Sequence, residues 1–242
     1  MGFSTGKVIR LFDVPVSDGG HYHLKLGFVS SEQIQWWVTN FISAFEVLGV
    51  LAFALSGLIE AKRKGLDIVG VAMVTAATAF GGGTLRDILL NRRPLFWVEH
   101  DWWIWVIIGL TLAALIFLRS RHLEITERAT KWPDAIGLGV FAASGTQIAL
   151  DMSKSAIVAV IMGVITSVIG GVIRDISTNQ IPRAFSDHEP YAAVAFIGCW
   201  FVVFASWMHL DSLWSVVIGA AFTIALRIMV MVFGWRVPAW RS

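Results

Sequence analysis

Two Arg-Asp pairs lie inside long apolar stretches of the sequence, and of all the residues in the chain they are the strongest candidates for a functional role. They are Arg86-Asp87 and Arg174-Asp175, which lie 88 positions apart. Within a membrane, a charged side chain costs about 2.5 to 3.5 kcal/mol or more, and it persists only when it is paired or faces a wet interior. We therefore expect these four residues to organise or gate a polar path.

Each arginine needs an acidic partner on another helix. Neighbouring residues of a helix point about 100° apart, so we expect little contact within each Arg-Asp pair. Glu46 and Asp134 are also 88 positions apart and lie at suitable depths. We predict the ion pairs Glu46–Arg86 and Asp134–Arg174. In the alternative reading, both arginines extend to the nearer membrane surface.

Clustered glycines precede both Arg-Asp pairs. Gly81, Gly82 and Gly83 precede the first pair, and Gly170 and Gly171 precede the second. Each glycine costs about 1 kcal/mol relative to alanine in a helix interior, and a run of them permits a kink or an unwound turn. Carbonyls freed in this way must face protein or water, so we expect a cavity beside each break. Close packing against a neighbouring helix is the alternative.

Four hydroxyl side chains also recur at the 88-residue offset, Ser56 with Ser144 and Thr78 with Thr166. Hydroxyls and carbonyls can replace part of the water shell of a cation in a selective pore. The pattern therefore favours a hydrated cation path. A single hydroxyl of this kind is more often bonded to the carbonyl four residues earlier in its own helix.

Motifs of catalysis and of metal binding do not occur in the sequence. It contains no Gly-x-Ser-x-Gly elbow, phosphate-binding loop, His-Glu-x-x-His or dinucleotide fingerprint. The six histidines share no ligand spacing, and the single cysteine, Cys199, lies in an apolar stretch. Lys and Arg (19) nearly balance Asp and Glu (17), which does not suit a polyanionic partner. We predict no enzyme activity, catalytic residue, metal, cofactor or nucleic-acid partner.

The elements that must position these residues are predicted to be transmembrane helices. The chain has 242 residues, of which 56% are hydrophobic and 15% charged, too few charges to cover a soluble domain. A helix needs about 20 mainly apolar residues to cross the hydrocarbon core. Seven segments meet this length: 37–60, 66–91, 102–119, 132–150, 155–178, 191–209 and 213–234.

Lys and Arg residues are divided unevenly between the two sides of these segments. Ten fall on the side of the loop at 62–64 and six on the other side, three of these in the N-terminal tail. Positive residues accumulate in cytoplasmic loops. We therefore expect a multi-pass protein of the inner (plasma) membrane, with its N-terminus outside and its C-terminus in the cytoplasm.

The 88-residue offset extends beyond the charged residues. Phe53-Ala-x-Ser-Gly57 recurs as Phe141-Ala-x-Ser-Gly145, and Asn91-x-x-Pro94 recurs as Asn179-x-x-Pro182. One repeat contains three predicted spans, an odd number, so the two copies must be inverted relative to each other. Functional sites of inverted repeats lie near the midplane, where interrupted helices face a cavity.

The predicted fold class is an all-α membrane protein with seven transmembrane helices, formed by two inverted three-helix repeats plus a seventh helix. We expect a polar N-terminal extension at 1–35 and the first repeat at 36–119. The inverted second repeat follows at 120–212, and the seventh helix with a cytoplasmic tail occupies 213–242.

Together these motifs resemble the prokaryotic branch of the trimeric intracellular cation channel family. The resemblance rests on the repeated Phe-Ala-x-Ser-Gly motif and on Gly81-Gly-Gly-x-x-Arg-Asp87 with its counterpart Gly170-Gly-x-x-Arg-Asp175. It covers about residues 38–234. It implies seven transmembrane helices, kinks at the glycine clusters, and a homotrimer in which each protomer has its own pore. It also implies conduction of potassium and sodium. Membrane lipid is an expected partner of the protein.

Three functions remain open at this point. The first is a monovalent-cation channel with a pore between the kinked second and fifth predicted helices of each protomer. The second is a secondary transporter of a small solute such as glycine, a label also attached to this type of domain. The third is a membrane scaffold whose polar residues only hold helices together. The seventh helix outside the repeat and the short loops favour the channel.

Overall fold

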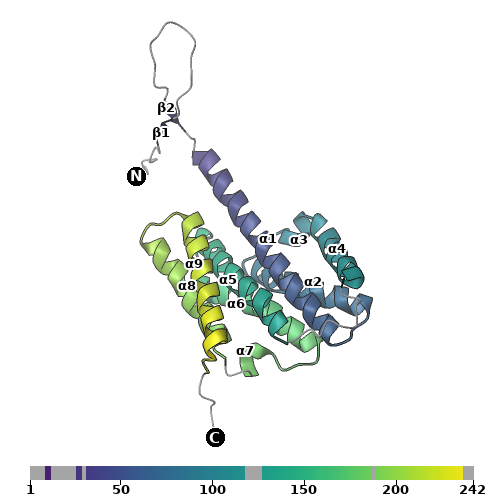
Figure 1. The fold of residues 1–242 in the computed structure, drawn as a ribbon. Coiled ribbons are helices and arrows are strands. Elements are labelled where there is room, and N and C mark those ends of the chain that lie inside the picture. Colours follow the sequence, from purple (N-terminus) through teal and green to yellow (C-terminus); the bar gives the residue numbers. More distant parts are fainter. Residues whose placement is uncertain (1–8, 12–25, 29–30, 118–126, 187–188, 237–242) are drawn as a thin grey trace, which may run out of the picture. The chain divides into compact units, whose positions relative to one another are not determined.

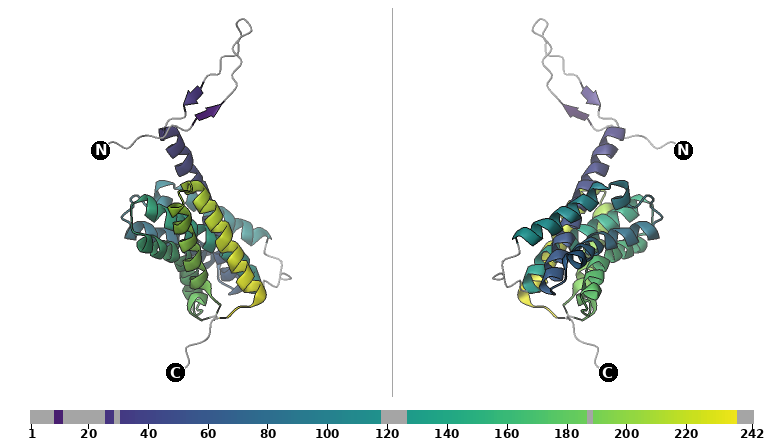
Figure 2. Two further views of the ribbon diagram at one scale, coloured as in Figure 1. Left: turned by 90° about the vertical axis from the view of Figure 1, so that its left-hand side faces the viewer. Right: turned by 90° about the vertical axis from the view of Figure 1, so that its right-hand side faces the viewer.

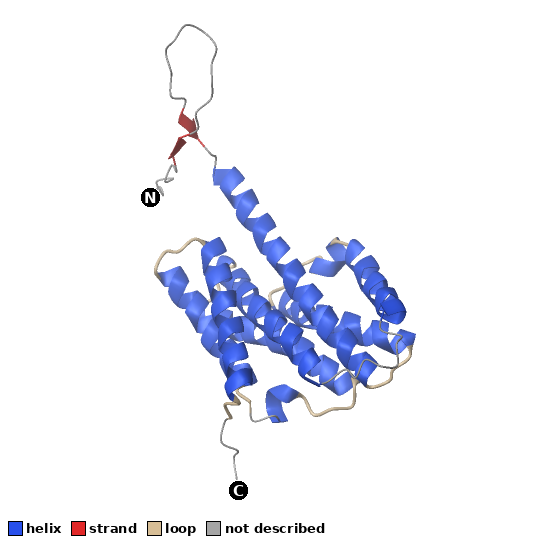
Figure 3. Ribbon diagram, viewed as in Figure 1, coloured by secondary structure: helices blue, strands red, loops and turns tan. Residues whose placement is uncertain are grey.

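The computed structural model describes residues 9–11, 26–28, 31–117, 127–186 and 189–236. The chain divides into two units, Met1–Ser43 and Ala44–Ser242. In the first unit, strands β1 (Ile9–Leu11) and β2 (Leu26–Phe28) pair antiparallel, as the red arrows of Figure 3 show. An all-α chain is predicted, and this strand pair is the exception. Apolar residues alternate with a polar or small one in both segments, which suits a strand.

Helices form the described secondary structure of the second unit, and the first of them begins within the first unit (Figures 1 and 2). They are α1 (Ser31–Arg63), α2 (Ile68–Leu89), α3 (Phe96–Glu99), α4 (Trp102–Phe117), α5 (Glu127–Asp151), α6 (Ala156–Ser177), α7 (Arg183–Ser186), α8 (Tyr191–Trp207) and α9 (Ser212–Phe233). The seven longer ones coincide with the seven predicted segments, although α1 begins earlier, inside the expected extension. The four-residue helices α3 and α7 are additional.

Length and apolar composition single out three of the described helices, α2, α6 and α9, as long enough to cross a membrane. Helices α4 and α8 are apolar but shorter. Helices α1 and α5 are long, but each carries acidic residues in its interior, among them Glu46 and Asp134. The count of seven spans therefore stays a prediction.

Helix α5 holds much of the second unit together. It contacts α6, α8 and α9, and α6 also contacts α2 and α8. Figure 1 shows α9 running beside α5. The main apolar cluster joins these helices through buried residues such as Leu138, Val160 and Val230. Helix α1 joins α5 through the rings of Phe53 and Phe141, whose centroids are 5.2 Å apart.

Both Asn-x-x-Pro motifs lie where a long helix ends. Asn91 follows α2 with a φ of 56°, and Asn179 follows α6 with a φ of 54°. Asparagine adopts this left-handed conformation more readily than most residues. The Asn91 N–H donates to the Ile88 carbonyl at 3.1 Å, and the Asn179 N–H donates to the Ile176 carbonyl at 3.0 Å. The repeat seen in the sequence therefore extends to backbone hydrogen bonds.

The glycine clusters do not interrupt their helices. Because α2 and α6 stay helical through them, the expectation of unwound turns is wrong, while the expected kinks stay a prediction. The glycines instead let two backbones touch. A Cβ at Gly82 would collide with the Thr166 carbonyl oxygen, and a Cβ at Gly170 would lie 2.6 Å from the Thr78 carbonyl oxygen. Close helix contact needs the missing side chain and leaves the helical hydrogen bonds intact.

The other cluster glycines face side chains. A Cβ at Gly81 would meet Ile173 of α6, and a Cβ at Gly83 would lie 2.6 Å from the Phe96 ring of α3. Gly171 has more room, because its Cβ would lie 3.1 Å from the Tyr191 hydroxyl. All of these contacts agree with the packing alternative.

Gly82→Ala should lower stability, because the added methyl group meets a backbone carbonyl that cannot turn away. Overpacking of this kind costs about 1 to 3 kcal/mol. Gly109→Ala is the matched control, because a Cβ at this exposed position of α4 would meet nothing within 4 Å. The melting temperatures of both variants and of the wild type, measured by thermal unfolding in detergent, test this prediction. An unchanged melting temperature for Gly82→Ala would contradict the backbone contact.

Candidate functional site

The first charge cluster, defined as Glu46, Arg86 and Asp87, joins α1 to α2. Arg86 is 0% exposed and Asp87 1% exposed. The Arg86 Nη1 donates to Glu46 Oε1, and the Arg86 Nε donates to Asp87 Oδ1 at 2.8 Å. Arg92, which is more exposed, approaches the same Asp87 oxygen at 3.4 Å. A buried guanidinium is thus held between two carboxylates.

The second charge cluster, defined as Asp134, Arg174 and Asp175, joins α5 to α6 in the same way. All three residues are buried. The Arg174 Nη1 donates to Asp134 Oδ1, and the Arg174 Nε donates to Asp175 Oδ1 at 2.9 Å. Here the arginine has one further partner, because its Nη1 also donates to Ser56 Oγ of α1 at 2.6 Å.

Both predicted interhelical ion pairs, Glu46–Arg86 and Asp134–Arg174, are present. Neither arginine extends to the surface. The expectation of little contact within each Arg-Asp pair is wrong, since both neighbours are bonded. An arginine side chain is long enough to fold back along its helix, and a buried guanidinium needs partners for its five donors.

The second carboxylate oxygen of each aspartate accepts a hydrogen bond from the first residue of a short helix. The Phe96 N–H donates to Asp87 Oδ2 at 3.2 Å, at the beginning of α3. The Arg183 N–H donates to Asp175 Oδ2 at 2.9 Å, at the beginning of α7. Each aspartate therefore connects the buried arginine to the segment that follows its long helix.

The four predicted hydroxyls have different partners. Thr78 and Thr166 each donate at 2.6 Å to the carbonyl four residues earlier, as in the alternative reading. Ser56 donates to the Thr130 carbonyl at 3.3 Å and accepts from the second cluster. Ser144 is fully buried, and its Oγ has no hydrogen-bond partner in the described part of the chain.

Glu60 is a buried acidic residue that sequence reasoning missed. It is 0% exposed and ties together four segments at one end of the second unit. Arg63 Nη2 donates to Glu60 Oε1 at 2.6 Å, and Thr130 Oγ1 donates to Glu60 Oε2 at 3.1 Å. Gln180 and Arg183 complete the shell. The available signal was a second acidic residue in the same apolar segment as Glu46.

Arg227 anchors α9, and it is a third arginine inside a predicted span, the segment at 213–234. It is 1% exposed, and its Nη2 donates to Glu189 Oε2 at 2.9 Å. Its guanidinium lies over the Tyr191 ring, 4.8 Å from the centroid. Lys131 of α5 donates to the other Glu189 oxygen at 2.9 Å. Glu189 thus bridges α5 and α9.

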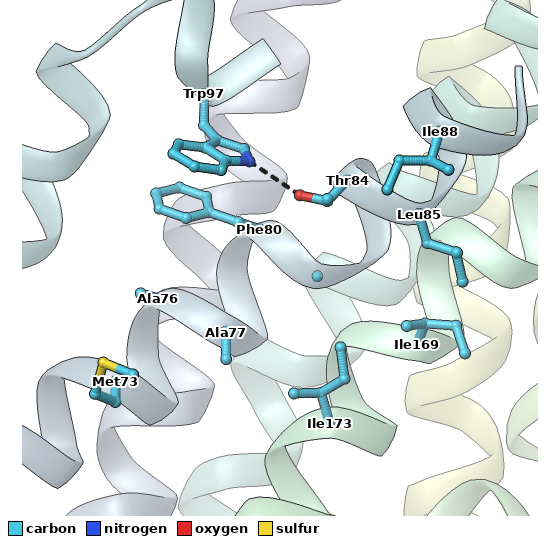
Figure 4. Close-up of a pocket in the computed structure, with 11 residues that line it drawn as sticks. Met73, Ala76, Ala77, Phe80, Thr84, Leu85, Ile88, Trp97, Ile169 and Ile173 are labelled. Carbon is cyan, nitrogen blue, oxygen red and sulfur yellow. Dashed lines mark hydrogen bonds between the residues drawn. The ribbon is translucent and has the colours of Figure 1, made fainter. Parts of the chain in front are cut away.

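An apolar groove of about 490 Å³ runs along α2 and α6 (Figure 4). Its lining includes Met73 and Leu85 of α2 and Ile173 of α6. The polar edge is satisfied internally, because the Trp97 indole N–H donates to Thr84 Oγ1 at 3.0 Å. The groove therefore suits contact with apolar groups only.

Nothing in the described residues gathers three or more His, Cys, Asp or Glu side chains in a way that could hold a metal ion. The carboxylates of both clusters are bound to guanidinium groups instead. Each cluster contains two acids and one arginine. With all three charged, each cluster alone carries one excess negative charge. At the first cluster the Arg92 guanidinium on Asp87 balances this charge, so only the second cluster keeps an excess that attracts cations.

Long apolar helices packed around buried ion pairs define a helical membrane protein. A family model described as "Glycine transporter" matches residues 43–119 and again residues 131–207. A UPF0126 membrane protein of Vibrio cholerae is 36% identical over 190 residues, which cover 78% of this chain and 79% of that protein. The UPF0126 inner membrane protein YadS of Escherichia coli K12 is 35% identical over 157 residues, 63% of this chain and 73% of that protein.

Solved structures of trimeric intracellular cation channels share the fold. Those of the orthologue from Rhodobacter sphaeroides give a TM-score of 0.74 at 29% identity, covering 80% of this chain and 98% of that chain. A structure described as the basis for conductance through these channels gives 0.73 at 34% identity, covering 83% and 97%. The chain belongs to the trimeric intracellular cation channel family.

Arg86→Ala should damage folding, because it leaves Glu46 and Asp87 buried without their common partner. Removing one member of a buried ion pair costs about 3 to 5 kcal/mol. The matched control is Arg92→Ala, which removes a more exposed guanidinium from the same aspartate and should cost no more than about 1 kcal/mol. Detergent unfolding measures both. An Arg86→Ala variant as stable as the wild type would contradict the role of the first cluster.

Glu189 should make stability depend on pH. Burial opposes its charge, but the Lys131 hydrogen bond and the Arg227 charge outweigh burial and hold the pKa of Glu189 below its usual range. A carboxylate with a lowered folded-state pKa stabilises the fold above its unfolded pKa of about 4.3, and this contribution is lost as the pH falls through the folded pKa.

Between pH about 5 and about 3, the melting temperature should therefore fall more steeply for the wild type than for Glu189→Gln. The difference between the two curves of melting temperature against pH gives the contribution of Glu189 alone, because all other carboxylates are present in both proteins. Parallel curves would show that the bridge between α5 and α9 contributes nothing.

Proposed function

We propose that the protein is a passive channel for monovalent cations, potassium and sodium. The observation that carries the proposal is the likeness to solved trimeric intracellular cation channels, with TM-scores of 0.73 to 0.74 over 80% to 83% of the chain. The excess of carboxylates over guanidinium groups in the second charge cluster supports cation preference, because fixed negative charge beside a pore favours cations.

We propose one path per protomer, between α2 and α6 and beside the two charge clusters. The α2 and α6 backbones touch at Gly82 and Gly170, so the present conformation is closed at that level. Conduction then requires these helices to shift at the glycines, which have no side chains of their own to interlock. Ser56 and Ser144 are the hydroxyls proposed to face the path. Thr78 and Thr166 donate within their own helices, whereas Ser56 bonds to other helices and Ser144 has no hydrogen-bond partner among the described residues.

The proposal includes a membrane architecture. Seven spans would be formed by the seven longer helices, in inverted repeats at 36–119 and 120–212 followed by α9 in 213–242. The matching ion pairs of the two clusters support this repeat, as do the two matches of one family model. Residues 118–126, at the boundary between the repeats, lie outside the described part of the chain.

We further propose a homotrimer in the inner membrane, with the N-terminus outside and the C-terminus in the cytoplasm. The solved relative from Rhodobacter sphaeroides is described as trimeric. Large apolar side chains such as Val69, Trp105 and Phe233 are more than 60% exposed on the single chain, and lipid or neighbouring protomers would cover them. Membrane lipid is the expected bound molecule, with permeating ions as the only other species.

Recording from purified protein in planar bilayers tests the channel. In asymmetric potassium chloride we expect unitary currents that reverse near the potassium equilibrium potential. Replacing potassium by sodium should preserve the currents, and replacing it by a large organic cation should abolish them. Gly109→Ala, at an exposed position of α4 where an added Cβ would meet nothing within 4 Å, serves as a control for correct insertion and should conduct normally.

The description of the matching family model, "Glycine transporter", points to the alternative function, a transporter of glycine. A transporter alternates access around a closed site and gives saturable flux without unitary currents. Coupled glycine uptake into proteoliposomes, together with silent bilayers, would overturn the channel proposal in favour of a transporter.

A further inference from the structure

The 88-residue correspondence covers most bonds of the two charge clusters, and one buried bond of the arginines breaks it. Arg86 and Arg174 each bind an acid 40 positions earlier and the aspartate that follows. Arg174 also donates to Ser56 Oγ at 2.6 Å. The corresponding bond in the other half would join Arg86 to Ser144.

The corresponding partners, Arg86 and Ser144, are both buried, and each has unused bonding capacity. Ser144 is 0% exposed, and its Oγ has no hydrogen-bond partner among the described residues. The Arg86 Nη2 lies 2.8 Å from Asp87 Oδ1, in a geometry that does not form a hydrogen bond. Leaving a buried hydroxyl and a buried guanidinium N–H without hydrogen bonds costs free energy. A conformation in which the two bond to each other is therefore favoured, because it satisfies both groups.

The sequence explains why the bond is made in one half and not in the other. Ser56 Oγ donates to the Thr130 carbonyl at 3.3 Å, and Thr130 Oγ1 donates to Glu60 at 3.1 Å. This chain of bonds supports Ser56 where it meets Arg174. The positions that correspond to Thr130 and Glu60 are Ile42 and Ile148. Ile42 still has a backbone carbonyl, but these two isoleucines cannot form the hydroxyl–carboxylate bond that ties Thr130 to Glu60. The asymmetry is therefore built into the residues.

We infer that Ser56 and Ser144 form a two-position latch, in which the protein exchanges between a state with Ser56 bound to Arg174 and a state with Ser144 bound to Arg86. The described conformation is the first state, stabilised by Glu60 and Thr130. This inference rests on the proposed channel function, in which the first state is closed at the α2–α6 contact and the second is the open one. Each hydroxyl then sets the population of one state.

Alanine variants of the two serines should change gating in opposite directions. Ser56→Ala removes a bond to a charged group from the closed state, and we expect the open-to-closed ratio to rise about tenfold. Ser144→Ala removes a bond from the open state, and we expect the ratio to fall by a similar factor. Single-channel recording in planar bilayers measures both. Changes of the same sign in the two variants, or no change in either, would overturn the latch.

Ser167→Ala is the matched control. Ser167 is also a fully buried serine of α6, but its hydroxyl donates at 3.1 Å to the Val164 carbonyl of its own helix. We expect the open-to-closed ratio to stay at the wild-type value. If Ser167→Ala shifts the ratio as strongly as the latch variants do, the effect belongs to any buried serine and the latch is refuted.

A measurement that needs no current separates the latch from the channel proposal. Hydrogen exchange of the purified protein in detergent should become faster across residues 178–185 in Ser56→Ala, because Arg174 loses the bond that holds it beside Asp175 and the start of α7. Ser144→Ala should leave that segment unchanged. If the wild type conducts no ions, the channel proposal fails, while equal exchange in both variants would refute the latch alone.

Discussion

A guanidinium buried between two carboxylates is the interaction on which the rest of the second unit depends. Taking such a charge out of water is tolerated only when nearly all its donors are matched. Arg86 therefore requires α1 beside α2, and Arg174 requires α5 beside α6. The neighbouring aspartates also fix the positions of the segments that follow, because their second oxygens accept hydrogen bonds from the N–H groups at the starts of α3 and α7.

The long helices and the interhelical ion pairs could be predicted because both follow from strong local signals. Apolar length defines a membrane helix, and a charge such as Arg86 within one needs a partner at the same depth. The helix breaks at the glycines could not be judged, since a glycine allows both a bend and a close contact, and the choice depends on the neighbouring backbone. The roles of Glu60 and Arg227 could not be predicted from the repeat. The partners of Glu60 include residues in the loop before α7, and Arg227 lies in α9, which has no counterpart at the 88-residue offset.

The two halves share a pattern without sharing every contact. Glu60 draws Arg63 and Thr130 together at one end of the second unit, whereas its counterpart Ile148 is apolar. Helix α3 packs through aromatic rings instead, with Phe96 between Phe80 and Trp103. A duplicated framework has thus acquired one polar end and one aromatic end. In the proposed channel, this difference would give the two ends of the path dissimilar linings.

The contact of Gly82 with a backbone carbonyl limits how this protein can evolve. A side chain that collides with another side chain can be accommodated by a smaller residue at the second position. The carbonyl of Thr166 is present whatever residue occupies that position, so no replacement there can restore the space lost to a methyl group at Gly82. Genetic suppressors of such a change must shift the helix as a whole, and they would arise along the α5 and α8 surfaces against which α6 packs.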